Sequence, residues 1–341
     1  MFNYFLRRFL LIIPTFVITT FVVFVILQET PGGPFEQEML KIQMKGAAGG
    51  DVGAGGGSKG GGVEIPEQAK QELMKYFDLD KPVPVRYILW LGKMARGDFG
   101  QSYTYSEPVL GVIISRFPVS IYFGLIGFLL SYIICVPLGI YKAIKHNSAF
   151  DLVSSTIVFI GYSIPGWALG AVLLVLFGGK YFPLGEFRSA GWEDLPFWDQ
   201  VWDQIHHTIL PVIAYMVGGF ATLTVLMKNS LLENLGQDYV RTAFAKGLTE
   251  RRVIFVHALR NSLIPIATGL GGFLGLIFAG SFLVEKTFNI DGLGLLGYRS
   301  IINRDYTVVM GTLVFGILVQ LTGNIFRDIL YAAIDPRIQF K

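Results

Sequence analysis

Side chains that could carry out catalysis or hold a metal ion are few in this sequence, and their spacing fits neither task. The four histidines, His146, His206, His207 and His257, include no pair at the HExxH spacing of a zinc site. The single cysteine, Cys135, lies in an apolar stretch, where it packs as a small apolar residue. The GxxxxGK[ST] pattern that binds nucleotide phosphates is absent. We therefore predict no catalytic residue, no metal site and no cofactor, and expect that the chain is not an enzyme.

The composition indicates a protein that resides in a membrane. Hydrophobic residues make up 52% of the chain and charged residues only 16%, whereas an ordinary globular chain carries roughly a quarter charged residues. The apolar residues form blocks of about 20, long enough to cross a ~30 Å hydrocarbon layer. The net charge of +3 is too small to indicate a nucleic-acid partner. The sequence therefore predicts an all-α integral membrane protein.

We predict six transmembrane helices, near residues 9–28, 119–141, 152–177, 208–227, 264–284 and 307–326. None of these segments has a charged residue or a histidine in its interior. Membrane enzymes and proton-driven transporters rely on ionisable groups at that depth. The sequence therefore disfavours both classes, and a transport function would need energy from another subunit.

Small residues recur four positions apart in two of these segments, Gly166 with Gly170 and Gly271 with Gly275. Such pairs let helix backbones approach closely in lipid. We expect them to serve helix packing, and the lining of a transport pathway is the alternative.

The distribution of lysine and arginine predicts the orientation. Thirteen of these residues lie before the first predicted helix, after the second, after the fourth or after the sixth, against five in the short segments opposite. Because short cytoplasmic segments carry the excess of positive charge, both termini are predicted to be cytoplasmic.

This topology divides the chain into three parts. Residues 1–28 form the first transmembrane helix, 29–118 form a large external segment, and 119–341 form a core with five further helices. Within the external segment, the tract 46–62 has ten glycines in seventeen positions and is predicted to be a flexible tether. Two short helices are expected after it, near 66–77 and 85–96, the second amphipathic and suited to lie on the membrane face.

The polar segment 228–263 has a pattern of two short helices that meet at a glycine. Gly247 is placed to end the first helix in a left-handed conformation, and Thr249 is placed to cap the second. Glu250 suits the positive N-terminal end of that second helix. Composition alone leaves two interpretations open, a plain basic loop and an element that docks on a partner.

The sequence of this segment resembles a known signature. Residues 239–265, YVRTAFAKGLTERRVIFVHALRNSLIP, are similar to the cytoplasmic loop of ABC importer permeases in its oligopeptide/dipeptide version. Thr242, Ala243 and Gly247 fill the signature positions, while Arg241 stands where the general form has Glu. The resemblance implies a coupling helix that inserts into a groove of an ATPase subunit. We expect Ala243 to supply the small contact face, with Lys246 and Glu250 flanking the turn.

Further motifs extend the resemblance along the chain. They are FLRRFLLIIPTFVITTFVVFVIL with Pro31–Pro34, residues 97–120, residues 291–311, and the ending Asp335-Pro336-Arg337. Together they resemble the ABC type I importer permease fold of the oligopeptide/dipeptide family, most closely its Yej-type peptide and microcin C branch.

The resemblance implies a multi-pass permease of the cytoplasmic (inner) membrane that imports peptides. The implied partners are a second homologous permease, two ABC ATPases and an extracytoplasmic substrate-binding protein. A permease for nickel complexes or sugars is the alternative, and a membrane scaffold is a more distant one.

The run DGLGLLG between the fifth and sixth predicted helices indicates an external gate. Its glycines are expected to break the helix and form a re-entrant loop near the site where the cargo enters the permease. The alternative interpretation is that this run simply connects the fifth and sixth predicted helices. The residues assigned to this external gate loop are Gly292, Leu293, Gly294, Arg299 and Asp305.

Overall fold

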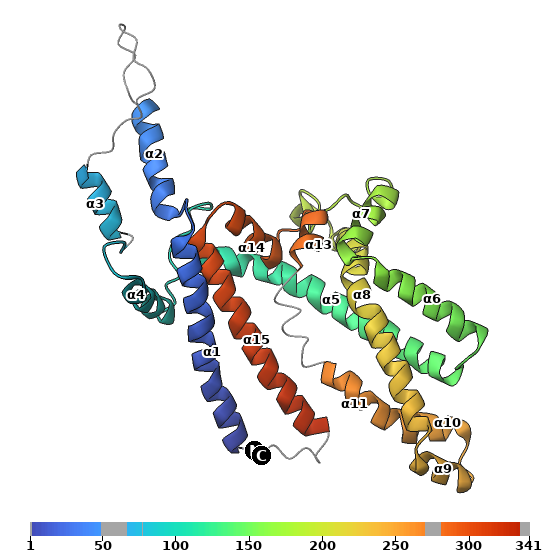
Figure 1. Ribbon diagram of the computed structural model, residues 1–341. Coiled ribbons are helices and arrows are strands. Elements are labelled where there is room, and N and C mark those ends of the chain that lie inside the picture. Colours follow the sequence, from blue (N-terminus) through green and yellow to red (C-terminus); the bar gives the residue numbers. More distant parts are fainter. Residues whose placement is uncertain (1, 49–66, 77, 270–280, 335–341) are drawn as a thin grey trace. The chain divides into compact units, whose positions relative to one another are not determined.

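The computed structural model of the protein describes residues 2–48, 67–76, 78–269 and 281–334, and these residues fold almost entirely into helices (Figure 1). The helices are α1 (Phe2–Glu29), α2 (Pro34–Ala48), α3 (Glu67–Tyr76), α4 (Val83–Ala95), α5 (Val109–Ile144), α6 (Ala149–Ser163), α7 (Gly166–Phe177), α8 (Phe197–Leu235), α9 (Asp238–Ala245), α10 (Glu250–Arg252), α11 (Leu259–Gly269), α13 (Phe282–Thr287), α14 (Leu293–Ile302) and α15 (Tyr306–Ile334). A π-helical segment, Val253–Ala258, joins α10 to α11.

Within the described residues, four helices are long and apolar enough to cross a membrane, namely Leu10–Glu29, Val109–Ile144, Phe197–Leu235 and Tyr306–Ile329. The pair α6 and α7 adds a fifth candidate if it counts as one bent span. The predicted span 264–284 falls largely outside the described residues, with α11 and α13 at its two ends. The all-helical membrane architecture is thus confirmed, while the number six stays a prediction.

The third predicted span is not one continuous helix. Its two halves, α6 and α7, meet at an angle of 97°. Ile164 is extended, with φ −100° and ψ 120°, and Pro165 precedes the first residue of α7. A proline disfavours the helical conformation of the residue before it. The expectation of a single helix over 152–177 was therefore wrong, because hydropathy does not register the backbone break at Pro165.

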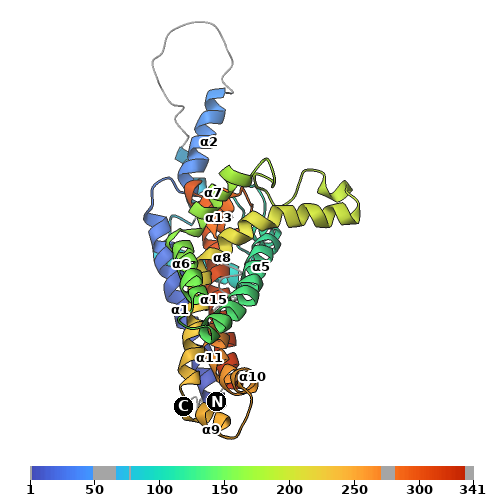
Figure 2. The ribbon, with the colours of Figure 1, turned by 90° about the vertical axis from the view of Figure 1, so that its right-hand side faces the viewer.

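The helices α5 and α8 extend well beyond the predicted apolar blocks. α8 has 39 residues, which at 1.5 Å per residue makes it about 58 Å long, roughly twice the thickness of the hydrocarbon layer. Pro211 lies inside it and leaves one backbone hydrogen bond unmade. Figure 2 shows the first turns of α8 bent away from the rest of the helix, as expected near an internal proline.

The chain divides into two compact units. Unit 1 comprises residues 1–10, 116–296 and 316–341, and unit 2 comprises residues 11–115 and 297–315. Unit 1 contains two apolar clusters, one at the C-terminal end of α8 and one near its middle. One surrounds Met227 and Leu231, and the other surrounds Phe123 and Phe288.

The core of unit 2 forms where α4 packs on α1. Tyr87 is buried between Phe21 and Phe24, with ring centroids 5.1 and 5.6 Å away. Its hydroxyl lies 2.8 Å from the Thr20 hydroxyl. The helix predicted at 85–96 is confirmed as α4. Its position on the membrane face stays a prediction: Tyr87 packs on α1, while Val85, Ile88 and Leu89 leave an apolar face of α4 exposed.

The other helices of the external segment, α2 and α3, were predicted only in part. The helix predicted near 66–77 is present as α3, whereas α2 had not been predicted. The glycine tract begins in the last turn of α2 and lies otherwise outside the described residues.

The predicted packing role of Gly166 and Gly170 is confirmed. A Cβ on Gly166 would overlap the backbone carbonyl oxygen of Ala214 in α8. A Cβ on Gly170 would lie 2.8 Å from the ring of Phe288 and 3.3 Å from Ala214 Cβ. The absence of a side chain at Gly166 and at Gly170 therefore allows α7 to contact α8 closely.

We expect Gly166→Ala to lower the free energy of unfolding by about 1–3 kcal/mol, because the added methyl group would displace the α8 backbone. Gly161→Ala is the matched control, since Gly161 lies in α6 with open space around its Cα. The control is expected to be neutral or stabilising by up to ~1 kcal/mol. Thermal unfolding of the purified variants in detergent measures both, and equal stability of the two would contradict the packing assignment.

Candidate functional site

The predicted two-helix loop is present at one end of α8, opposite the end that carries α7 and α13 (Figures 1 and 2). α9 ends at Ala245, and Gly247 follows with φ +76°. Its N–H donates to the carbonyl oxygen of Phe244 at 2.9 Å. This conformation strains residues that have a Cβ, so the prediction that Gly247 ends the helix in the left-handed region is confirmed.

Thr249 occupies the position before α10, as predicted, with extended φ and ψ of −65° and 145°. Its side chain makes no capping hydrogen bond, while its carbonyl oxygen accepts one from the Val253 N–H at 3.0 Å. The predicted side-chain cap is therefore not formed. From Val253 the helix widens into the π-helical segment that leads to α11.

Ala243 faces inward rather than outward. It is buried, as is Val240 one helical turn before it. Both pack in the apolar cluster with Met227 and Leu231 of α8, which also contains Ala143, Val253, Ala258 and Ile266. The expectation that Ala243 supplies the exposed contact face was therefore wrong. A small residue is needed there because α9 lies close against α8.

The exposed face of the loop carries the other predicted residues, namely Arg241, Thr242, Lys246, Gly247 and Glu250. Phe244, whose side chain is 46% exposed, was not among the predicted residues. The sequence contains a signal for its exposure. Val240 and Ala243, three positions apart, lie on one face of α9, and Phe244 lies outside that face. A large exposed aromatic on a charged loop is typical of an anchor for a protein partner.

At the opposite end of unit 1, the carboxylate of Glu285 in α13 is 1% exposed and accepts hydrogen bonds from three elements. Its Oε2 accepts from the Leu295 N–H of α14 at 2.6 Å. Its Oε1 accepts from the hydroxyls of Ser120 in α5 and Tyr215 in α8, both at 3.3 Å. Burial raises the pKa of this carboxyl above its ordinary value, although these donors act in the opposite direction.

The Glu285 carboxylate also explains the glycines of the DGLGLLG run. A Cβ on Gly292 would lie 2.6 Å from the Glu285 carboxyl group, and a Cβ on Gly294 would lie 2.7 Å from the Phe282 nitrogen. The Ser120 hydroxyl accepts from the Leu293 N–H at 2.8 Å. Two free N–H groups at the start of α14 are thereby satisfied. These glycines permit close contact, and the chain is helical from Leu293. The re-entrant or gate-like character of the run stays a prediction.

The other two residues of the predicted gate, Arg299 and Asp305, belong to unit 2. Asp305 is fully buried and accepts hydrogen bonds from the Ser102 hydroxyl at 2.6 Å and the Thr104 N–H at 3.0 Å. It also lies at the start of α15, where the Thr307 hydroxyl donates to it at 2.8 Å. Asp305 therefore fastens two segments of unit 2, and its side chain is not available to a ligand.

A histidine, a serine and an aspartate meet where the segment before α8 packs on that helix. His207 Nε2 lies 3.1 Å from Ser189 Oγ, and Asp203 also accepts from the Ser189 N–H at 3.1 Å. His207 Nδ1 lies 2.9 Å from the carbonyl oxygen of Gly185. In a catalytic triad the carboxylate pairs with that second ring nitrogen. Here it contacts the serine instead, so the group holds the loop in place.

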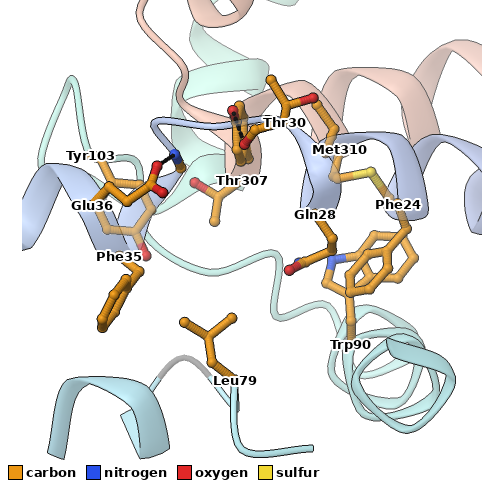
Figure 3. A pocket seen from close by; sticks show the side chains of 13 residues that line it. Phe24, Gln28, Thr30, Phe35, Glu36, Leu79, Trp90, Tyr103, Thr307 and Met310 are labelled. Carbon is orange, nitrogen blue, oxygen red and sulfur yellow. Dashed lines mark hydrogen bonds between the residues drawn. The ribbon is translucent and has the colours of Figure 1, made fainter. Parts of the chain in front are cut away.

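Each unit contains a cavity. The cavity in unit 2, about 240 Å³, lies between Phe24 and Trp90 on one side and Phe35 and Leu79 on another (Figure 3). It is smaller than typical small-molecule sites, which begin at about 300 Å³. The cavity in unit 1, about 660 Å³, lies between α5, α6 and α8 and is lined mainly by apolar side chains. Within the described residues, no three His, Cys, Asp or Glu side chains are grouped as metal ligands.

Comparison with known proteins gives consistent results. Residues 135–340 match the family model of the "Binding-protein-dependent transport system inner membrane component". The chain is 38% identical to the peptidoglycan transport system permease protein YejB of Agrobacterium fabrum, over 99% of this chain and 98% of the relative. It is 39% identical to the inner membrane ABC transporter permease protein YejB of Escherichia coli O157:H7, over 99% of each chain.

The similarity extends to a more distant relative and to a solved structure. The chain is 34% identical to the oligopeptide transport system permease protein AppB of Bacillus subtilis, over 99% of each chain. A chain of the MetNI methionine ABC transporter in an inward-facing conformation superposes with a TM-score of 0.50 at 16% identity, covering 66% of this chain and 99% of that chain. The similarity to this solved structure concerns the fold alone.

We expect Glu285→Ala to destabilise the protein, because the Leu295 N–H and the Ser120 and Tyr215 hydroxyls would lose their common acceptor. Each buried donor left unpaired costs about 1–3 kcal/mol. Glu193→Ala, at an exposed position before α8, is the control and is expected to change stability by less than ~0.5 kcal/mol. Thermal unfolding in detergent measures the difference. Equal unfolding temperatures for the two variants would contradict the assignment of Glu285 as a buried anchor.

Proposed function

The chain belongs to the family of binding-protein-dependent transport system inner membrane components, and we propose that it is the subunit through which an ATP-driven importer passes peptides. It is a transport subunit of the inner membrane and not itself an enzyme. The observation that carries the mechanism is the exposed loop α9–α10, which is packed by its inner face on α8 and presents Phe244 and charged side chains outward.

Peptides are the proposed substrate class. Similarity over the full length to permeases named for oligopeptide and peptidoglycan transport supports this proposal. Peptidoglycan fragments contain short peptides, so both names are consistent with one class of cargo, which includes microcin-like peptides. The alternative is a non-peptide solute such as a nickel complex or a sugar. A pure scaffold role is disfavoured, since it leaves the exposed two-helix loop without a purpose.

The proposed assembly follows from membership of a binding-protein-dependent transport system, which implies an ATPase and a binding protein as partners. We place two ABC ATPases on the cytoplasmic side, one substrate-binding protein outside, and a second, homologous permease beside this chain. The proposed topology has six transmembrane helices, both termini in the cytoplasm, residues 29–118 outside, and residues 228–263 in the cytoplasm. The excess of lysine and arginine in that last segment supports this orientation.

Energy coupling is proposed to occur at the α9–α10 loop. Arg241, Thr242, Lys246, Gly247 and Glu250 form the face that contacts the ATPase, with Phe244 as its apolar anchor. When ATP binding closes the ATPases, α9 and α10 are displaced, and the cluster around Ala243 transmits the movement to α5, α8 and α11. The permease then opens outward to receive cargo from the binding protein.

The external gate is proposed near Gly292, Leu293 and Gly294, where the binding protein releases its cargo. Glu285 is proposed to hold this turn against α5 and α8. Arg299 and Asp305 lie on the same external side in this topology. Because Asp305 is buried, its contribution to the gate is structural.

The topology predicts which engineered cysteines react from outside the cell. The chain offers a simple background, because its one cysteine, Cys135, is buried and can be replaced. We expect a membrane-impermeant maleimide to label Asn303→Cys in intact cells, but to label Lys246→Cys only in inverted vesicles. Asp305→Cys should react in neither preparation unless the protein is unfolded, because the side chain is fully buried. Labelling of Lys246→Cys in intact cells would contradict the topology.

The proposed coupling role predicts that different substitutions at Gly247 reduce peptide uptake to different extents. Leucine would strain the backbone at φ +76° by ~1 kcal/mol or more, and it would add bulk to the contact face. We expect Gly247→Leu to abolish peptide uptake while membrane insertion and permease pairing stay intact. Gly247→Asn is the matched variant, since asparagine tolerates the left-handed region, and it should retain much of the uptake.

Lys246→Ala and Glu250→Ala are expected to have smaller effects, because a partly exposed ion pair contributes under ~1 kcal/mol. The assay is ATP hydrolysis stimulated by the loaded binding protein in the reconstituted complex, together with co-purification of the ATPase. Normal uptake and normal ATPase binding by Gly247→Leu would show that this loop is not the coupling element.

A further inference from the structure

A buried cluster of charges connects α5, α6 and α8 close to the α9–α10 loop. Asp151, in the first turn of α6, is buried, and both its carboxylate oxygens accept hydrogen bonds from Lys228 Nζ of α8, at 2.7 and 2.8 Å. Lys142 Nζ of α5 lies 3.4 Å from Asp151 Oδ1. Three helices thus meet at one carboxylate.

Lys142 is held in a fixed position by this cluster. Its side chain is 1% exposed, an unusual environment for a lysine. Its Nζ donates to the hydroxyls of Ser154 and Ser155 at 2.8 and 2.7 Å and to the Asp151 carbonyl oxygen at 3.2 Å. All of these acceptors belong to α6. The ammonium group therefore fastens the last turn of α5 to the first two turns of α6.

The Asp151 carboxylate has two further contacts at the turn between α5 and α6. The Asn147 N–H donates to Oδ2 at 3.2 Å, and His146 Nδ1 lies 3.4 Å from the same oxygen. The side-chain hydroxyl of Ser148 accepts from the Asp151 N–H and so caps α6. The start of α6 is consequently fixed in orientation as well as in position.

The same turns of α5 and α8 carry the loop. Ala143, next to Lys142, and Met227, next to Lys228, are both in the apolar cluster that contains Ala243 and Val240 of α9. A movement of α9 against this cluster acts directly on the backbone segments that hold the two lysines. Because packed side chains do not compress, such a movement passes on as a shift of the whole group.

α6 has few other means of following α5 and α8 at this end. Most of its apolar side chains face outward, with Leu152 71% and Ile157 65% exposed. The Phe150 ring of α6 contacts the Tyr141 ring of α5, with centroids 4.8 Å apart, and the directional bonds to the Asp151 carboxylate attach α6 to α8 as well. Breaking a buried ion pair by removing one partner is strongly disruptive, because the other charge stays buried without compensation.

We propose that Asp151 is a positioning residue for transport: through Lys142 and Lys228 it makes α6 move with α5 and α8 when the α9–α10 loop is displaced. This inference rests on the proposed function, in which that loop docks on the ATPase. Asp151 is buried, so in this proposal it acts through the helices and not by contact with the ATPase or the cargo. Its role is to carry the displacement to α6, which continues through the break at Pro165 into α7.

The experiment compares four variants of the complete transporter in proteoliposomes with its binding protein and a fluorescent peptide. They are Asp151→Asn, Lys228→Met, the double variant that combines both, and the control Thr156→Val, at an exposed position on α6. Three quantities are measured: the yield of assembled complex, the basal rate of ATP hydrolysis, and the number of peptides imported per ATP hydrolysed. The yield reports stability, the basal rate reports docking of the ATPase, and the ratio reports coupling.

We expect Asp151→Asn and Lys228→Met to lower the number of peptides imported per ATP by about tenfold, within the range typical of coupling between sites. Basal ATP hydrolysis per assembled complex should stay within about twofold of the wild-type rate, and Thr156→Val should behave as the wild type. The double variant separates coupling from stability. It restores the net charge of the cluster and so should recover the yield, whereas the ratio should stay low because the bonds between α6 and α8 are still missing.

Two outcomes would overturn the proposal. If the double variant recovers the imported-peptide ratio together with the yield, the cluster serves stability alone. If the single variants keep the wild-type ratio, α6 does not need the Asp151 bonds in order to move. If the ATPase fails to co-purify with the wild-type permease, the proposed docking function itself is wrong. This measurement is independent of the number of peptides imported per ATP.

Discussion

The packing of α9 against α8 fixes the α9–α10 loop to the helical core of unit 1. Val240 and Ala243 are buried in one apolar cluster with Met227 and Leu231, so the inner face of the loop belongs to the helical core. A loop attached in this way cannot be displaced without moving the helices beneath it. Its outer face stays free for a partner, and Phe244 together with the charged side chains around it gives that face the character of a docking surface.

A different kind of interaction holds the other end of unit 1. There the carboxylate of Glu285 joins α13 to the start of α14, to Ser120 of α5 and to Tyr215 of α8. Hydrogen bonds to a buried carboxylate are directional and short-ranged, in contrast to the apolar cluster near the loop. Because α8 connects the two ends (Figure 2), a displacement at the loop would be carried to the turn at Gly292 through one helix. The proposed response of the external gate to the ATPases depends on this connection.

The sequence predicted the features that depend on local chemistry. Gly247 and the two-helix loop followed from the rules of helix termination, and the membrane spans followed from hydropathy. Features that depend on tertiary contacts could not be predicted in this way. Ala243 and Asp305 looked like exposed site residues, because nothing in their immediate sequence indicates that other segments cover them. Glu285 escaped notice for the same reason, since its partners lie on three elements far apart in the chain.

Cross-linking from the exposed face of the loop tests directly whether the loop docks on an ATPase. A photoreactive amino acid is placed at Lys246, which is exposed, and the complex is irradiated in native membranes. The cross-linked partner is then identified by mass spectrometry. We expect an ABC ATPase subunit to be cross-linked at Lys246 and none at Asn303, on the proposed external side. An ATPase cross-linked at Asn303 but absent at Lys246 would contradict both the orientation and the coupling role of the loop.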